Sequence, residues 1–458
     1  MAAPRELKEA IEGAPTPIAA NLTEDSLALH FARVHSSRLK YCHHRGSWYQ
    51  WDGTRWKREE TRLAFDWART LCRAMNVECK TNIAKSATAS SVEKYAQADR
   101  RFAVTSEIWD RDIWLLGTPG GTVNLRTGEL LAARQADCIT KQTLVAPDKH
   151  LNCPIWMQFL EDATRGDDTL ERFLRQMAGL CLTGSTREHA LFFIYGPGGN
   201  GKSVFIDAIV NILGDYARTA PMETFTASRG DRHPTDLAML QGARMVTASE
   251  TEEGRAWAEA RIKQITGGDR VAARFMRQDF FEYTPQFKLV IVGNYKPVLR
   301  NIDDATRRRF NVIPFTNAPE NPDRELEEKL KSEYPGILRW MIDGCLDWRN
   351  EGLLRPDVVM NATLTYFEEQ DIFGRWLEDR CEMGKYEGQY ESCERLYRSW
   401  TDYNLLNGEQ PGTSMGFATK LSRRGFEIGQ RQVDGRNAKC RLGISLIRLK
   451  KEDKRVQD

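Results

Sequence analysis

The sequence predicts an α/β fold in which a strand, a glycine-rich loop and a helix follow one another. The apolar run Leu191–Tyr195 indicates a buried strand. Residues 196–203 then read GPGGNGKS and match G-x-x-x-x-G-K-[ST] at every fixed position. Apolar residues recur at helical spacing from there to Gly214. This order of elements is the one that a phosphate-binding loop requires.

The loop predicts binding of a nucleoside triphosphate, ATP, together with Mg²⁺. Its backbone N–H groups and the helix N-terminus suit a polyphosphate. Lys202 is placed to reach the β- and γ-phosphates, and the Ser203 hydroxyl to bind the metal. A chance match in a glycine-rich turn is the alternative, and the flanking strand and helix argue against it. The nucleotide-binding residues are therefore expected to be Gly196, Pro197, Gly198, Gly199, Asn200, Gly201, Lys202, Ser203 and Val204.

The composition indicates a globular chain. Its 458 residues correspond to about three domains. No apolar run approaches the roughly 20 residues of a membrane span, and the N-terminus lacks the pattern of a secretion signal. The ten cysteines contain no C-x-x-C pair, so we expect reduced thiols in a cytoplasmic protein, with a structural metal near Cys42 as the alternative. The net charge of +2 means that any nucleic-acid site must depend on local clusters of charge.

The chain before the loop is expected to divide into three parts. Residues 47–56 alternate aromatic and polar residues around Asp52-Gly53, which indicates a hairpin. We favour packing over base stacking as the role of its three tryptophans. The three parts are a flexible tail, an α+β domain and a helical collar, in residues 1–24, 25–150 and 151–188.

Residues 189–345 are expected to form the nucleotide domain. Polar residues follow the ends of its further apolar strands. A second apolar strand, residues 245–248, leads to Glu250, beside the loop strand, where a carboxylate can hold Mg²⁺ and activate water. A third strand, residues 289–293, ends in Asn294, whose amide can orient the attacking water. The alternatives are that Glu250 is only an exposed acid at the end of a strand and that Asn294 is only a turn residue.

Three arginines, Arg307, Arg308 and Arg309, precede a fourth strand in residues 310–315. Consecutive arginines before an apolar strand are costly unless they meet phosphate or carboxylate. One of them is a candidate arginine finger for the ATP site of a neighbouring subunit, which predicts an oligomer. A solvated basic turn is the alternative.

A basic insertion with interleaved aromatic residues separates the second and third strands, in residues 261–281. The charges can hold phosphates and the rings can stack on bases, so we expect this insertion to contact single-stranded DNA. Its cationic candidates are Lys263, Arg270 and Arg274. A hairpin that only packs on its neighbour is the alternative.

In this order the motifs resemble those of superfamily 3 helicases. The resemblance is to the phage and plasmid replication helicases related to the poxvirus-type primase–helicase. In the nucleotide domain it rests on the loop, the strand ending at Glu250, and residues 263–275 (KQITGGDRVAARF), 288–294 (KLVIVGN) and 307–315 (RRRFNVIPF). Upstream, the segments that resemble the helicase-associated region are Trp51-Asp52-Gly53, residues 114–116, residues 124–128 and Ile139-Thr140-Lys141.

The resemblance implies an AAA+-like P-loop ATPase core that works as a ring, with a homo-hexamer as the expected assembly. In that family the second motif supplies the acid, here Glu250, and the third supplies the sensor, here Asn294. The finger usually precedes the apolar strand directly, so Arg309 is favoured, with Arg308 next.

The resemblance also places Arg277 and Gln278 near the tip of a DNA-contacting hairpin that faces the central channel. The chain departs from the family where Glu250 is followed by Thr251 instead of a second acid. Glu252 is therefore a candidate to share the role of Glu250. Longer relatives carry a primase domain upstream, and primer synthesis is not implied here.

The C-terminal part is expected to bind duplex DNA. From residue 420 onward, twelve Lys/Arg stand against five acids. A basic helix followed by a wing suits DNA phosphates, with Arg423 and Arg424 as candidates, and a basic tail that only aids solubility is the alternative. Connecting helices, a winged helix and a basic tail are expected in residues 346–375, 376–450 and 451–458.

Together these features predict a Mg-ATP-dependent DNA helicase for replication of a phage, plasmid or other mobile element. It would translocate on single-stranded DNA as a ring and act on forked DNA, with a separate primase or polymerase as a candidate partner and no membrane partner. The first alternative is an origin-binding initiator or loader that uses ATP without processive unwinding. The second is a small-molecule kinase, which would have no use for a basic hairpin.

Overall fold

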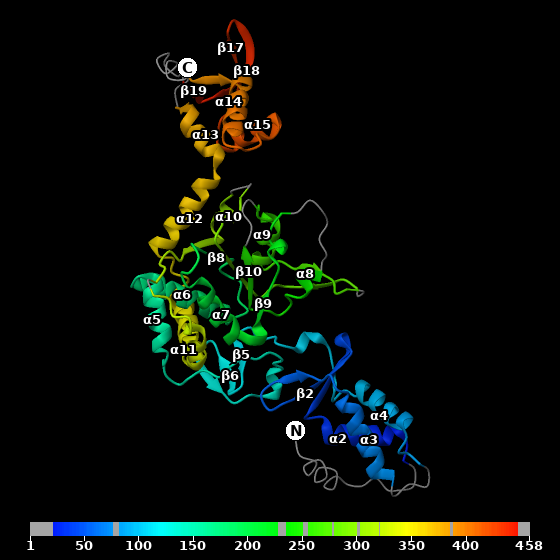
Figure 1. The fold of residues 1–458 in the computed structure, drawn as a ribbon. Coiled ribbons are helices and arrows are strands. Elements are labelled where there is room, and N and C mark those ends of the chain that lie inside the picture. The colour runs from blue at the N-terminus through cyan, green and yellow to red at the C-terminus, as the bar shows by residue number, and fades with distance from the viewer. Residues whose placement is uncertain are drawn as a thin grey trace. The chain divides into compact units, whose positions relative to one another are not determined.

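The computed structural model describes most of the chain. The described residues are 22–76, 82–227, 235–250, 255–276, 279–299, 303–319, 321–384 and 388–447, and of Glu250 only the backbone is described. Arg277, Gln278, nearly all of the expected flexible tail and the basic tail therefore lie outside the described residues. The chain divides into two compact units, Met1–Lys296 with Arg308–Met360 and Pro297–Arg307 with Asn361–Asp458 (Figure 1).

The N-terminal region of the first unit combines helices with two small sheets. Thr23 caps the first helix, because its hydroxyl accepts from the Ser26 N–H while the Ser26 hydroxyl accepts from the Thr23 N–H. The helices are α2 (Glu24–His35), α3 (Leu63–Met75) and α4 (Ser86–Ala98). The sheets have the orders β3-β2-β1-β4 and β5-β6-β7. Their strands are β1 (Leu39–Cys42), β2 (Ser47–Trp51), β3 (Trp56–Arg58), β4 (Ala103–Val104), β5 (Leu115–Thr118), β6 (Gly121–Asn124) and β7 (Glu129–Leu131).

The aromatic residues of the β2–β3 hairpin pack inside this region. Trp48, Tyr49 and Trp56 are buried, and the Tyr49 ring stacks on Trp109 with centroids 4.6 Å apart. Trp51 packs against Trp56 at 5.6 Å. The prediction that these rings serve packing is thus confirmed.

Helices at the start and end of the nucleotide domain form one bundle. The helices α5 (Pro154–Thr164), α6 (Asp168–Cys181) and α11 (Leu326–Glu351) pack on one another and on α7 (Lys202–Leu213) (Figure 1). Trp156 lies at the centre of this bundle, stacked on Phe205 at 5.5 Å and edge-on to Trp340 at 5.4 Å. The expected collar is therefore helical, and α11 continues through residue 345, where we expected the nucleotide domain to end.

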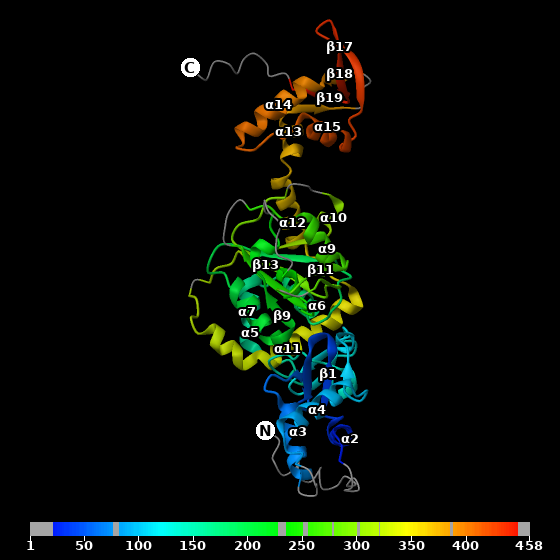
Figure 2. The ribbon, with the colours of Figure 1, turned by 90° about the vertical axis from the view of Figure 1, so that its right-hand side faces the viewer.

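A five-stranded sheet with the order β14-β8-β13-β10-β9 forms the centre of the first unit (Figure 2). All of its neighbouring strands are parallel. The strands are β8 (Leu191–Tyr195), β9 (Ala217–Thr219), β10 (Met245–Glu250), β13 (Lys288–Gly293) and β14 (Phe310–Pro314). Our expectation that the strand ending at Glu250 lies beside the loop strand is wrong, because β13 intervenes between β8 and β10. The order cannot be read from the chain, since β13 comes after β10 in sequence.

The insertion between β10 and β13 forms a helix and a hairpin. The short helix α8 (Thr235–Ala238) precedes β10, and α9 (Glu259–Gly267) follows it. The antiparallel pair β11 (Val271–Ala273) and β12 (Phe281–Tyr283) then forms the hairpin.

The second unit has its own aromatic core. Trp376, Trp400 and Phe417 are buried, with the Trp400 and Phe417 rings stacked at 5.9 Å. The order of helices followed by a hairpin matches the expectation for this part. Its elements, together with α12, which joins the units, are α10 (Asp304–Arg307), α12 (Asp357–Gln370), α13 (Ile372–Arg380), β15 (Cys381–Met383), β16 (Tyr390–Ser392), α14 (Cys393–Leu406), α15 (Ser414–Arg423), β17 (Ile428–Val433), β18 (Arg436–Leu442) and β19 (Ile444–Leu446). Within the described ranges, no helix has both the length and the apolar character needed to cross a membrane.

Candidate functional site

Three strand ends meet at one edge of the central sheet. Tyr195 of β8 is opposite Gly293 of β13, and Gly293 is opposite Glu250 of β10. Neighbouring strands lie about 4.8 Å apart, so the backbone of Glu250 is roughly 10 Å from that of Tyr195. The glycine-rich loop that follows β8 and Asn294, which follows β13, therefore share this edge with Glu250.

The loop requires its first and fourth glycines. Gly196 has φ +156°, and a Cβ there would collide with the carbonyl oxygen of Phe315. Gly201 has φ +80°, and its Cβ would lie 2.7 Å from the Phe159 ring. The Asn200 amide donates to the same Phe315 carbonyl. These close approaches fix the loop between the ends of β8 and β14 and the side of α5.

Lys202 lies inside the loop at the start of α7. Its ammonium donates to the carbonyl oxygens of Gly196 and Pro197, both at 2.7 Å, and to Asn200 Oδ1 at 2.9 Å. Burial lowers the pKa of the Lys202 ammonium. The lysine is thus held by short-range acceptors of the loop, with its charge at the centre of the residues that the sequence assigns to phosphate.

A cavity of about 510 Å³ adjoins the loop. This volume lies within the range of small-molecule sites. Its walls are mostly apolar and come from the loop, from α5 and from the segment before α11. The residues that form it include Ile155, Phe159, Ala163, Gly199, Gly201, Val204, Pro319, Pro322 and Leu326. Asn317 Nδ2 donates to the Asp162 carbonyl at 2.5 Å and so holds the last segment against α5. The sequence motifs missed this cavity, because α5 and residues 317–326 carry no phosphate-binding signal.

The metal ligands proposed from the sequence fit Mg²⁺ chemically. The Ser203 hydroxyl is exposed in the first turn of α7, and Glu250 ends β10 at the same edge of the sheet. Both residue types offer the hard oxygen atoms that Mg²⁺ prefers.

The three arginines before β14 have different environments. Arg309 is buried, and its Nε donates to Thr266 Oγ1 at 3.2 Å. Its carbonyl accepts from the Leu191 N–H at the start of β8, so it lies at the opposite edge of the sheet from the loop. Arg308 is exposed. Arg307 belongs to the second unit, where its guanidinium lies 5.0 Å from the Phe367 ring centroid. The sequence order favours Arg309 as a finger, whereas exposure favours Arg308.

The β11–β12 hairpin exposes apolar and cationic side chains beyond its two strands. The Arg274 guanidinium lies 4.8 Å over the Phe280 ring, and Phe275 stacks on Phe281 at 5.4 Å. Phe280 is 62% exposed and Met276 is 75% exposed. This exposure argues against the alternative in which the hairpin only packs on its neighbour.

The other predicted DNA-binding residues divide between two locations. Arg270, at the base of the hairpin, is exposed and pairs with Glu282 at 3.8 Å, while Lys263 is half-buried on α9. In the second unit, Arg423 is exposed at the end of α15, and Arg424 forms an ion pair with Asp371.

Arg441 is a cation of the second unit that we did not single out in the sequence. Its NH1 donates to the Phe426 carbonyl and the Ser422 hydroxyl, both at 2.8 Å, and its NH2 donates to the Ala418 carbonyl at 2.6 Å. The buried guanidinium thus joins β18 to α15. No motif surrounds Arg441, so only its burial reveals this role.

Two family models match the chain. Residues 28–165 match the family described as D5 N terminal like, and residues 194–309 match a family of unknown function, DUF5906. The protein named "Putative helicase L207/L206" of Acanthamoeba polyphaga mimivirus is 25% identical over 300 residues, which is 59% of this chain and 31% of that protein. "Putative helicase 022R" of Frog virus 3 is 27% identical over 270 residues, which is 53% of this chain and 27% of that protein.

The chain is thus similar to viral proteins named as putative helicases, and its N-terminal part matches the D5 N terminal like family. It spans about a third of the length of the curated relatives it matches. Among solved structures, the apo structure of the NrS-1 C terminal region aligns with a TM-score of 0.51 at 12% identity, over 93% of this chain and all of that one. The chain therefore shares a mixed α/β fold with the NrS-1 region.

Proposed function

We propose that this chain is an ATP-dependent DNA helicase for replication of a phage, plasmid or other mobile element. One observation carries the proposal. The loop around Lys202, the end of β10 at Glu250 and the end of β13 before Asn294 lie at a single edge of a parallel sheet. The relatives named as helicases support the same function.

We assign the residues at this edge of the sheet the following roles in hydrolysis. The loop N–H groups and Lys202 bind the triphosphate, and the ammonium exchanges its loop acceptors for phosphate oxygens. Ser203 and Glu250 would hold Mg²⁺, which supplies neutralisation of the phosphate charge when it is bound. Glu250 takes the proton from the attacking water, and Asn294 orients that water. The adjoining cavity takes the flat, largely apolar base.

Hydrolysis of ATP at an interface between subunits would account for the consecutive arginines before β14. Arg309 is buried at the sheet edge away from the loop, so the exposed Arg308 is the better finger for a neighbouring subunit's triphosphate. A finger supplied in trans requires an assembly, and a homo-hexameric ring is the form we propose. Arg309 then supports the segment that presents Arg308.

DNA is proposed to bind at the hairpin and at the second unit. Arg274 offers a charge for phosphates, and the exposed Phe280 ring offers a surface for bases of a single strand. The second unit is proposed to act as a winged helix, with Arg423 of α15 facing duplex phosphates. Together these sites suit a fork, where one strand is drawn away from the other.

Unwinding of forked DNA, with the oligomer mass recorded in parallel, tests the proposal. We expect ATP-dependent strand displacement by an oligomer. Lys202→Ala should abolish ATPase activity and displacement while DNA binding survives, and the exposed Lys149→Ala serves as the matched control. ATP-dependent assembly on duplex DNA without displacement would instead establish the initiator or loader. ATPase activity of a monomer that does not depend on DNA would contradict the proposed helicase function.

A further inference from the structure

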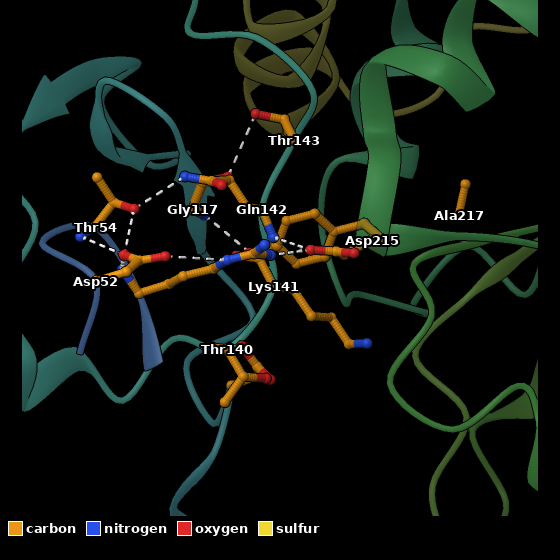
Figure 3. Close-up of polar contacts among 12 residues, drawn as sticks. Asp52, Thr54, Gly117, Thr140, Lys141, Gln142, Thr143, Asp215 and Ala217 are labelled. Atoms are coloured by element: carbon orange, nitrogen blue, oxygen red, sulfur yellow. Dashed lines mark hydrogen bonds and ion pairs between the residues drawn. The ribbon is translucent and has the colours of Figure 1, made fainter. Parts of the chain in front are cut away.

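The end of the P-loop helix that lies away from the loop is attached to the N-terminal region. Helix α7 ends at Leu213, and Gly214 turns the chain with φ +54° into Asp215. The Asp215 N–H donates to the Gln142 carbonyl at 3.1 Å, and Asp215 Oδ2 accepts from the Gln142 N–H at 3.2 Å. The same carboxylate forms an ion pair with the guanidinium of Arg55 (Figure 3).

The turn that presents Arg55 is itself fixed. Asp52 Oδ1 accepts three hydrogen bonds of 2.8 Å, from the N–H and hydroxyl of Thr54 and from the N–H of Arg55. Gln142 Nε2 donates to the Thr54 hydroxyl at 3.1 Å, so the turn and the 140–144 segment hold each other (Figure 3). Arg55 therefore meets Asp215 from a preorganised turn.

The 140–144 segment adds contacts on either side of Asp215. The Leu144 N–H donates to the Ile212 carbonyl in the last turn of α7 at 2.9 Å. The Tyr216 hydroxyl donates to the Lys141 carbonyl at 3.1 Å. Two motifs that resemble the helicase-associated region, at 51–53 and 139–141, thus converge on the end of α7.

The position of the ion pair matters more than its strength. The side chains of Arg55 and Asp215 are 19% and 45% exposed, and a partly solvated pair contributes little to stability. However, α7 has twelve residues and is about 18 Å long, with Lys202 at its first position. A helix behaves as a rigid element, so a shift of the loop on nucleotide binding would move Asp215 as well.

We propose that Arg55 and Asp215 are positioning residues that couple the nucleotide state of the P-loop to the N-terminal region. The proposal rests on the proposed binding of ATP at the loop. When the loop rearranges around a triphosphate, α7 transmits the shift through Asp215 to the hairpin that carries Arg55. The N-terminal region is then part of the motor cycle, beyond its role as a packed neighbour of the sheet.

Hydrogen exchange with and without a non-hydrolysable ATP analogue and Mg²⁺ tests the coupling. In the full chain, we expect peptides covering residues 47–58 to change their exchange when the analogue binds. Asp215→Asn keeps an acceptor for the Gln142 N–H but removes the ion pair, and it should abolish this response. Arg58→Gln, at an exposed arginine of the same hairpin, is the matched control and should retain it.

Turnover provides a second readout. In Asp215→Asn we expect kcat of the DNA-stimulated ATPase to fall roughly three- to tenfold, with KM for ATP changed by less than about twofold. The exchanged pair R55D/D215R should recover part of the loss. A purely structural contact would raise exchange in residues 47–58 equally with and without nucleotide.

The coupling and the helicase proposal fail in different ways. A wild-type protein that binds the analogue with no change in residues 47–58 would overturn the coupling, whatever its unwinding activity. A nucleotide response in residues 47–58, in a protein that displaces no DNA strand, would support the coupling and count against the helicase function.

Discussion

Arg309 Nε lies 3.2 Å from Thr266 Oγ1, in a buried hydrogen bond that joins the start of β14 to the end of α9. Arg308, the preceding residue, is exposed. Because α9 leads into the β11–β12 hairpin, the arginine segment and the hairpin proposed to contact DNA are both supported by α9. The two adjacent arginines thus differ in environment, because Arg309 is buried inside the fold and Arg308 is at the surface.

Arg308 and Arg309 should therefore respond differently to substitution. Arg308→Ala should lower ATP turnover about 10³-fold without a change in thermal stability, as expected for a finger. Arg309→Ala should lower the free energy of unfolding by about 2 kcal/mol, because it removes a buried hydrogen bond from a charged guanidinium to Thr266. Steady-state ATPase assays and chemical denaturation measure the two effects. Equal loss of turnover in both variants, with Arg308→Ala also unfolding, would contradict this division.

The tip of the hairpin should bind single-stranded DNA. Phe280→Ala should weaken binding by about 1–3 kcal/mol through lost stacking. Arg274→Ala should also reduce the slope of log K against log salt concentration by about 0.7. Fluorescence anisotropy with a labelled oligonucleotide over a salt series measures both. Arg100→Ala, at an exposed arginine of the N-terminal region, is the control, and an equal effect there would remove the hairpin from the DNA path.

The cavity beside the loop should set the affinity for the nucleoside. Ala163→Phe fills the space where we place the base, so KM for ATP should rise roughly tenfold while kcat changes little. Ala98→Phe, at an exposed position near the end of α4, should leave both constants unchanged. An unchanged KM for ATP in Ala163→Phe would show that the base binds outside this cavity.

Glu250 should act as the general base. Glu250→Gln keeps a metal-binding oxygen but cannot take a proton, so hydrolysis should fall by about 10²- to 10⁴-fold while nucleotide binding persists. Isothermal titration and single-turnover hydrolysis separate binding from chemistry. Glu252→Gln is the companion variant, and a comparable loss there would show that the two acids share the role.

Acid should destabilise the N-terminal region through His35. Burial first, and then the charge of Arg38, lower the pKa of His35 to about 3, and its ring stacks on Trp67 at 4.5 Å. Because the unfolded state binds the proton near pH 6.5, stability is full above that pH and is lost as the pH falls. The free energy of unfolding should drop by about 1 kcal/mol between pH 7 and 5.5.

His35→Phe provides the control for that pH dependence. The aromatic ring is retained while the titrating group is removed, so the loss between pH 7 and 5.5 should shrink. Denaturation followed by tryptophan fluorescence measures both proteins. An identical pH dependence in the variant would assign the effect to other groups, such as the buried His30, whose pKa is also lowered, first by burial and then by Arg33.

The sequence by itself determined the loop and the strands of the nucleotide domain. Residues 191–214 specify strand, turn and helix through neighbours in the chain. The positive φ of Gly201 is likewise a local requirement that the glycine itself meets. The ends of β10 and β13 at Glu250 and before Asn294 were likewise readable, because apolar runs stop there. Local periodicity and motif spacing are sufficient where the interacting residues are contiguous.

Only the tertiary structure decided which distant segments meet. It placed β13 between β8 and β10, buried Arg309 against Thr266, formed the cavity from α5 and residues 317–319 and 321–326, and brought Arg55 to Asp215. None of these contacts has a local signal, because each depends on packing between segments that are 40 or more residues apart. The residues predicted to bind phosphate thus lie in one stretch of the sequence, whereas the contacts that join the loop's helix to the rest of the chain depend on how distant elements pack together.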